Sequence, residues 1–163
     1  MQKIRHNVFE TNSSSTHSIS IHSDSVDTYH TLYPDREGVL TFQGGEFGWE
    51  FAKYSDAITK AEYLVTLFKV HGQPCQELFE RVVLNHTGAK KIEYDIKGTY
   101  SAYIDHQSLE CSKNPIFHLT EETMRDFIFN PKSVLMTGND NDSRRWVNEE
   151  LVDTDDKDYE WDD

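Results

Sequence analysis

The sequence predicts an α+β fold, in which a mainly antiparallel or mixed sheet packs against two or three helices. Two observations carry this prediction. Apolar residues recur at helical spacing over residues 57–68 and 78–83, and they alternate with polar residues over 18–22 and 91–96. The length of 163 residues fits one ordinary domain. We therefore expect a single globular domain over residues 1–152 and an acidic, mobile tail over 153–163.

The first predicted strand covers residues 18–22. The alternation places His17 in phase with Ile19 and Ile21, so the imidazole should face the core at the start of this strand. The side chains of residues 16, 18 and 20 should face the other way.

A glycine-rich stretch follows a polar loop over residues 23–38 and a short predicted strand over 39–42. Gly44, Gly45 and Gly48 interrupt the chain, and a second strand is predicted where aromatic residues alternate over 47–51. No Lys-Ser or Lys-Thr pair follows these glycines, so the stretch does not match a phosphate-binding loop. A hairpin turn or a bulge is the favoured interpretation.

Two consecutive helices are predicted next. The first begins at a cap residue, Ser55 or Asp56, and ends near Gly72. The second begins at Pro74 and ends at Gly88. Their apolar stripes indicate core packing and comprise Ala57, Ile58, Ala61, Leu64, Val65 and Phe68 in the first helix and Leu78, Phe79, Val82 and Val83 in the second.

The remaining elements are two strands joined in a hairpin at Gly98, a third helix and a last short strand. The hairpin is predicted over residues 91–104, because one continuous strand of that length would be unusual. Thr120 should cap the third helix, and Asn130-Pro131 should end it. Residues 134–136 form the last predicted strand, and a polar turn over 137–142 follows it.

The charge of the chain restricts its function. The formal net charge is −13 at pH 7, and the stretch from Asn139 to Asp163 carries eleven acidic and three basic residues. Such a chain is not expected to bind the nucleic-acid backbone non-specifically, since that binding requires Lys and Arg. The charge favours solubility, a basic partner, or mimicry of a polyanion. Because no signal peptide or membrane-spanning stretch is recognised, we expect a cytoplasmic protein that binds no membrane.

Residues 9–18 are the densest run of short polar side chains in the sequence. Together with Arg5, this Phe-Glu-Thr-Asn-Ser-Ser-Ser-Thr-His-Ser run resembles the N-terminal signature of a largely uncharacterised family of tailed-phage and prophage proteins of Gram-positive hosts. Three further segments resemble the same pattern: 44–49, 105–108 and 137–141. The resemblance implies a phage accessory protein in the cytoplasm of a bacterial host cell, and it implies no mechanism.

Three polar clusters lie beside predicted strand ends, over residues 10–17, 105–108 and 139–142. Sites gather where strands end and loops begin, so we expect the clusters to converge. His17, His106 and Asp105 are the candidate catalytic residues. The candidate ligand-binding residues are Glu10, Asn12, Ser13, Ser14, Ser15, Thr16, Asn139 and Asp140.

These residue types suit a phosphate-bearing ligand, such as a nucleotide or a nucleic-acid end. Two histidines and a carboxylate are also ligand types of a transition metal, so a divalent metal and metal-assisted hydrolysis are an option. The alternative for each histidine is a hydrogen-bonded core residue, and the serines could satisfy their own backbone.

A second class of function is an acidic inhibitor that mimics nucleic acid and binds a basic host protein. The candidate surface is residues 149–163, with Trp146, Tyr159 and Trp161 as anchors. The alternative for this segment is a solvated tail that aids solubility. The sequence leaves enzyme and interaction protein both open.

Overall fold

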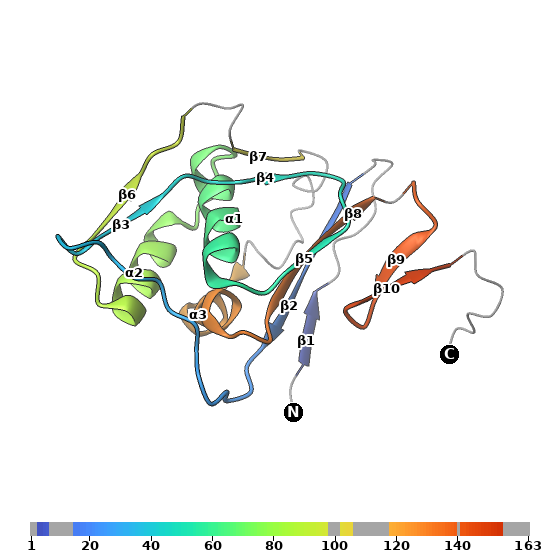
Figure 1. Ribbon diagram of the computed structural model, residues 1–163, viewed down its shortest axis with the longest axis horizontal. Coiled ribbons are helices and arrows are strands. Elements are labelled where there is room, and N and C mark those ends of the chain that lie inside the picture. The colour runs from blue at the N-terminus through green and yellow to red at the C-terminus, as the bar shows by residue number, and fades with distance from the viewer. Residues whose placement is uncertain (1–2, 7–14, 98–101, 106–117, 140, 155–163) are drawn as a thin grey trace.

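A four-stranded antiparallel sheet is the central layer of the protein, which we describe from a computed structural model. The structure describes residues 3–6, 15–97, 102–105, 118–139 and 141–154. The strands lie in the order β1-β2-β8-β5 (Figure 1). Their bounds are Lys3–His6 for β1, Ser15–His22 for β2, Ala52–Tyr54 for β5 and Val134–Asn139 for β8.

Three helices cover one side of this sheet (Figure 1). They are α1 (Ala57–Lys69), α2 (Gln76–Thr87) and α3 (Glu121–Phe129), which confirms the predicted α+β class. The predicted caps are also confirmed. Asp56 accepts a hydrogen bond from the Thr59 N–H, Thr120 caps α3, and Gly88 ends α2 in the left-handed conformation.

The helical stripes form the core as predicted, with one exception. The side chains from Ala61 to Phe68 that face inward are at most 6% exposed, whereas Ile58 is 45% exposed. Ile58 lies in the first turn of α1.

The predicted hairpin over residues 91–104 is wrong. β6 (Lys91–Tyr94) pairs in parallel with β3 (Val39–Phe42), and β7 (Tyr103–Ile104) pairs in parallel with β4 (Glu46–Phe47). The two later strands therefore run alongside the two earlier ones in separate small sheets. Alternation predicted each strand but could not select its partner, because partner choice depends on contacts that are distant in sequence.

A hairpin that the sequence did not predict lies on the other side of the four-stranded sheet (Figure 1). Its strands are β9 (Arg144–Val147) and β10 (Glu150–Asp153). The turn places Asn148 and Glu149 at positive φ, 51° and 68°, as tight two-residue hairpins require. β10 includes Asp153, the first residue of the predicted tail, and residues 155–163 lie outside the described part of the chain.

Glu149 attaches this hairpin to the sheet. Its carboxylate accepts hydrogen bonds from Ser20 Oγ at 2.6 Å and His22 Nε2 at 3.0 Å. The prediction that His17, Ile19 and Ile21 face the core is confirmed, since all three are at most 4% exposed. Ser20, expected on the wet face, is buried as well because the Glu149 turn covers it.

Lys60 joins α1 to the end of α3 and the start of β8. Its ammonium group, fully buried, donates to the Asn130 carbonyl at 2.9 Å and to the Ser133 carbonyl at 2.8 Å. Burial lowers the pKa of Lys60 to about 7.

None of the helices in the described part of the chain is long and apolar enough to cross a membrane.

Candidate functional site

His17 lies at the start of β2 with both ring nitrogens engaged. Nε2 is 2.8 Å from the Gly48 carbonyl oxygen, and Nδ1 is 3.3 Å from the Tyr63 hydroxyl. Because a carbonyl can only accept, Nε2 carries the proton, and Nδ1 accepts from Tyr63. The rings of His17 and Tyr63 also meet edge to face, with centroids 5.9 Å apart.

The environment of His17 favours the neutral imidazole. Its side chain is 1% exposed, and burial lowers its pKa, against smaller opposing effects of the Gly48 hydrogen bond and the negative charge of Asp105. A general base needs a free nitrogen within reach of a substrate proton. His17 thus has the bonding of a core histidine, the alternative that its position in the strand had left open.

The structure brings together the described members of the three polar clusters. Ser15 is the register partner of Asn139 in the β2–β8 pair, and Thr16 is the partner of Gly138. Asp105 follows β7, where its N–H donates to the Phe47 carbonyl at 3.0 Å, and its charge acts on His17. Residues 15–17 therefore lie beside the end of β8, and Asp105 at the end of β7 is near enough for its charge to act on His17.

The remaining predicted site residues lie outside the described residues: Glu10, Asn12, Ser13, Ser14, His106 and Asp140. Within the described part of the chain, no group of three or more His, Cys, Asp or Glu side chains could hold a metal ion. The metal-assisted chemistry accordingly stays a prediction.

A cavity of about 430 Å³ opens beside His17, and we call it the rim pocket. Two of its lining residues touch or face the histidine, since Gly48 accepts the His17 hydrogen bond and Thr137 is the register partner of His17. The lining comprises Glu46, Gly48, Trp49, Glu50, Tyr54, Tyr103 and Thr137. None of the predicted site residues is among the described residues that line the rim pocket, and His17 contacts it only through Gly48 and Thr137.

Helix α1 holds the glycine turn that leads into the rim pocket. The carboxylate of Glu62 accepts the N–H groups of Gln43 and Gly44, and Thr66 Oγ1 accepts the Gly45 N–H at 2.9 Å. Gly44 has φ +78°, and a Cβ there would come within 2.8 Å of the Ala102 methyl group. The glycine stretch is thus a backbone turn anchored on a helix. It is not the hairpin turn that the sequence favoured, because β3 and β4 belong to different two-stranded sheets.

In β4, successive side chains lie on opposite faces of the strand, one toward the core and one toward the rim pocket. Phe47 is buried, with its ring centroid 4.9 Å from that of Tyr63 and 6.0 Å from that of Tyr54. Glu46 faces outward into the pocket. The Thr137 hydroxyl donates to the Glu50 carbonyl at 2.6 Å, which ties the far wall of the pocket to β8.

The chemistry of the rim pocket is acidic and aromatic. Its charged lining residues are two carboxylates, Glu46 and Glu50, and neither forms an ion pair with any residue that the structure describes. Trp49 is 52% exposed and Tyr103 39% exposed. Burial, with a further contribution from the nearby Glu50 carboxylate, raises the pKa of the Tyr54 hydroxyl.

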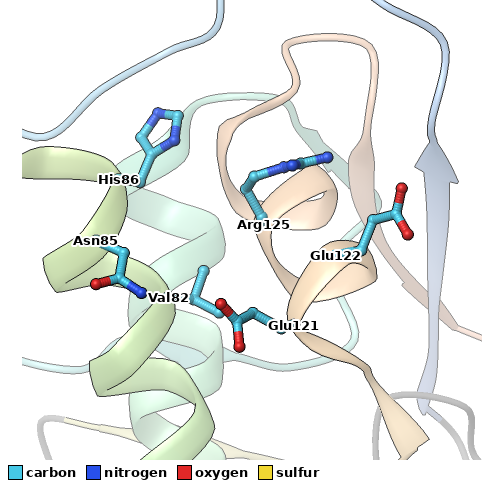
Figure 2. A pocket seen from close by; sticks show the side chains of 6 residues that line it. All are labelled: Val82, Asn85, His86, Glu121, Glu122 and Arg125. Carbon is cyan, nitrogen blue, oxygen red and sulfur yellow. The ribbon is translucent and has the colours of Figure 1, made fainter.

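A second cavity, of about 420 Å³, lies between α2 and α3, and we call it the interhelix pocket. Figure 2 shows Val82, Asn85 and His86 from α2 and Glu121, Glu122 and Arg125 from α3. Most of its polar groups are paired within the protein. His86 Nε2 donates to the His30 carbonyl at 3.0 Å, Glu121 binds Arg81 at 3.0 Å, and Arg125 binds Asp126 at 2.7 Å.

The predicted site residues do not include the aromatic lining of the rim pocket. Trp49 lies within a segment that the family resemblance singled out, but its alternation was interpreted as strand packing. Tyr103 is out of phase with the buried residues Ala102 and Ile104, so the strand pattern itself marks this ring as exposed. An exposed aromatic residue on a short predicted strand was therefore the feature of the sequence that could have indicated this binding surface.

Comparisons with models of protein families, with curated protein sequences and with solved structures give no match. The function is therefore argued from the geometry.

Proposed function

We propose that this protein is an interaction protein whose rim pocket receives a positively charged group of a partner protein. One observation carries the proposal. The rim pocket is lined by two carboxylates and three aromatic rings, with no Lys or Arg among the described residues that line it. Opposite charge and aromatic faces both favour a cation.

The net charge of −13 supports the same class of partner. A strongly acidic protein attracts basic partners over distances near the Debye length, about 8 Å at physiological ionic strength. This proposal keeps the interaction-protein alternative of the sequence analysis but moves its binding surface from the tail to the rim pocket. The origin of the partner in a bacterial host cell stays a prediction of the phage resemblance.

Two contacts explain why the surface moves. Trp146, a predicted anchor, donates its indole N–H to the Thr137 carbonyl at 2.7 Å, and Glu149 is engaged with Ser20 and His22. Both therefore hold the hairpin to the sheet.

The phosphate-bearing ligand finds less support in the described residues. The described lining of the rim pocket carries two carboxylates, so a phosphate would meet Glu46 and Glu50 without a Lys or Arg from the described residues. That function stays a prediction that depends on residues 10–14 and 106.

The test is the affinity of the full chain for a fluorescent peptide of alternating Arg, Lys and Gly, measured by anisotropy at low and at high salt. The double variant Glu46→Gln/Glu50→Gln should bind about tenfold more weakly, equivalent to about 1.4 kcal/mol. The matched control is Glu121→Gln/Glu122→Gln, which removes the same charge from the interhelix pocket. Equal weakening in both double variants would reduce the proposal to general charge attraction and contradict a role for the rim pocket.

A further inference from the structure

We propose that the cation bound in the rim pocket is the guanidinium group of an arginine side chain, stacked on the exposed aromatic rings and paired with the two carboxylates. This inference rests on the proposed function and specifies the partner's chemistry.

The aromatic walls are the first argument. Trp49 and Tyr103 are two of the five large hydrophobic side chains that are markedly exposed among the described residues, and both line this cavity. They come from segments more than 50 positions apart, which the parallel pairing of β4 with β7 brings together. A ring that stays half exposed costs free energy in water, and a planar cation stacked on it recovers part of that cost.

The carboxylates are the second argument. Glu46 and Glu50 lie four residues apart on either side of Trp49, and neither has a cationic partner among the described residues. The negative charge of Glu50 also affects another lining residue, since it adds to the effect of burial in raising the pKa of Tyr54. An arginine side chain would supply the missing positive charge and could engage a carboxylate with two parallel N–H donors.

The neutral acceptors of the pocket are the third argument. The Gly48 carbonyl oxygen accepts one hydrogen bond, from His17 Nε2, which leaves its second lone pair. The Tyr103 hydroxyl lies over the Gly48 backbone, 3.5 Å from the position that a Cβ would occupy. These acceptors suit a group with five N–H donors.

Other cations fit this combination less well. A trimethylammonium group has no N–H donor and would leave the carboxylates and carbonyl without hydrogen bonds. A lysine ammonium group is compact and strongly hydrated, so it loses more on entering an aromatic-lined cavity. Guanidinium is weakly hydrated, planar and rich in donors. It can stack on the aromatic rings and donate hydrogen bonds to the acceptors at the same time.

The test compares four peptides of sequence Gly-Ser-X-Ser-Gly, in which X is arginine, lysine, trimethyllysine or citrulline, by calorimetric titration of the full chain. We expect arginine to bind most tightly and citrulline, its neutral isostere, to show no binding. Trp49→Leu should weaken arginine binding about tenfold and lysine binding less, whereas Trp49→Phe should retain most of it. Tyr33→Leu, at an 86% exposed aromatic outside the pocket, is the matched control and should change nothing.

The outcomes separate the two proposals. Equal binding of lysine and arginine, or tightest binding of trimethyllysine, would overturn the arginine assignment and leave a cation-binding pocket. Binding of citrulline as tight as that of arginine, or no binding of any charged peptide, would overturn both. Melting curves of the Trp49 variants serve as the control, because unchanged melting temperatures would show that a loss of binding does not come from unfolding.

Discussion

The rim pocket and the interhelix pocket have almost the same size, about 430 and 420 Å³, and opposite degrees of internal pairing. In the interhelix pocket, Glu121, Arg125 and His86 are bound to neighbours within the protein. In the rim pocket, the carboxylates and two of the rings have no comparable partner among the described residues. Groups that are satisfied internally gain little from a ligand, so the comparison favours the rim pocket as the proposed binding site.

The two pockets also differ in how their walls are built. The interhelix pocket is formed by two capped helices, whose backbone is satisfied within each helix. The rim pocket is formed by a glycine turn and a two-residue strand, which depend on contacts from α1, β2 and β8. We therefore expect substitutions in the walls of the rim pocket to lower the free energy of unfolding more than substitutions in the walls of the interhelix pocket.

The largest effect is expected at the glycines of the two regions. Gly44 at the rim and Gly88 at the end of α2 have similar φ, +78° and +71°, but only Gly44 has neighbours where a Cβ would lie. Gly88→Ala should cost about 1–2 kcal/mol for the left-handed conformation. Gly44→Ala should cost a further 1–3 kcal/mol, roughly, for the collision with Ala102. Urea unfolding measures both, and equal costs would contradict a tightly anchored rim.

A smaller effect is expected from His17, which supports the rim pocket from behind. Its pKa in the folded protein is lowered from 6.5, so the unfolded state binds more protons as the pH falls below 6.5. The free energy of unfolding should then decrease on acidification, by at most about 1.4 kcal/mol per pH unit for this one proton.

The variant His17→Gln isolates that contribution. Near pH 8 it should be less stable than the wild type by about 1–3 kcal/mol, because the Gly48 and Tyr63 groups lose a partner. The difference should narrow toward pH 5, since glutamine does not titrate. A constant difference from pH 8 to pH 5, measured by urea unfolding at each pH, would show that His17 does not stay neutral in the folded protein.

The smallest effect is expected in the interhelix pocket. Arg81 and Glu121 are paired at 3.0 Å, but both side chains are 55% exposed, so solvent screens the interaction. Glu121→Gln should change the free energy of unfolding by less than about 1 kcal/mol, and the change should shrink in 0.5 M salt. A loss above 2 kcal/mol that persists in salt would show that this pocket also depends on its charges.

The candidate site was only partly accessible to sequence reasoning. The places of residues 15–17, 105 and 139 at strand ends predicted that they converge, and the structure has residues 15–17 beside the end of β8 and Asp105 near enough for its charge to act on His17. The phase of a strand indicates that His17 is buried, but it does not indicate whether its ring nitrogens form hydrogen bonds. That information came only from its partners in the structure, Gly48 and Tyr63. The pocket itself was not predicted, since its rings were interpreted one at a time.

The local pattern of the chain determined the three helices with their caps, the core face of β2, and the strands at 39–42 and 134–136. Each of these depends on spacings of two to four residues, which the sequence displays directly. Tertiary structure alone decided that β6 and β7 pair with β3 and β4, that Glu149 docks the β9–β10 hairpin, and that Glu46, Trp49 and Tyr103 share a cavity. The physical reason is that these pairings join residues far apart in the chain. Their free energy comes from packing and desolvation between segments, which no local spacing records.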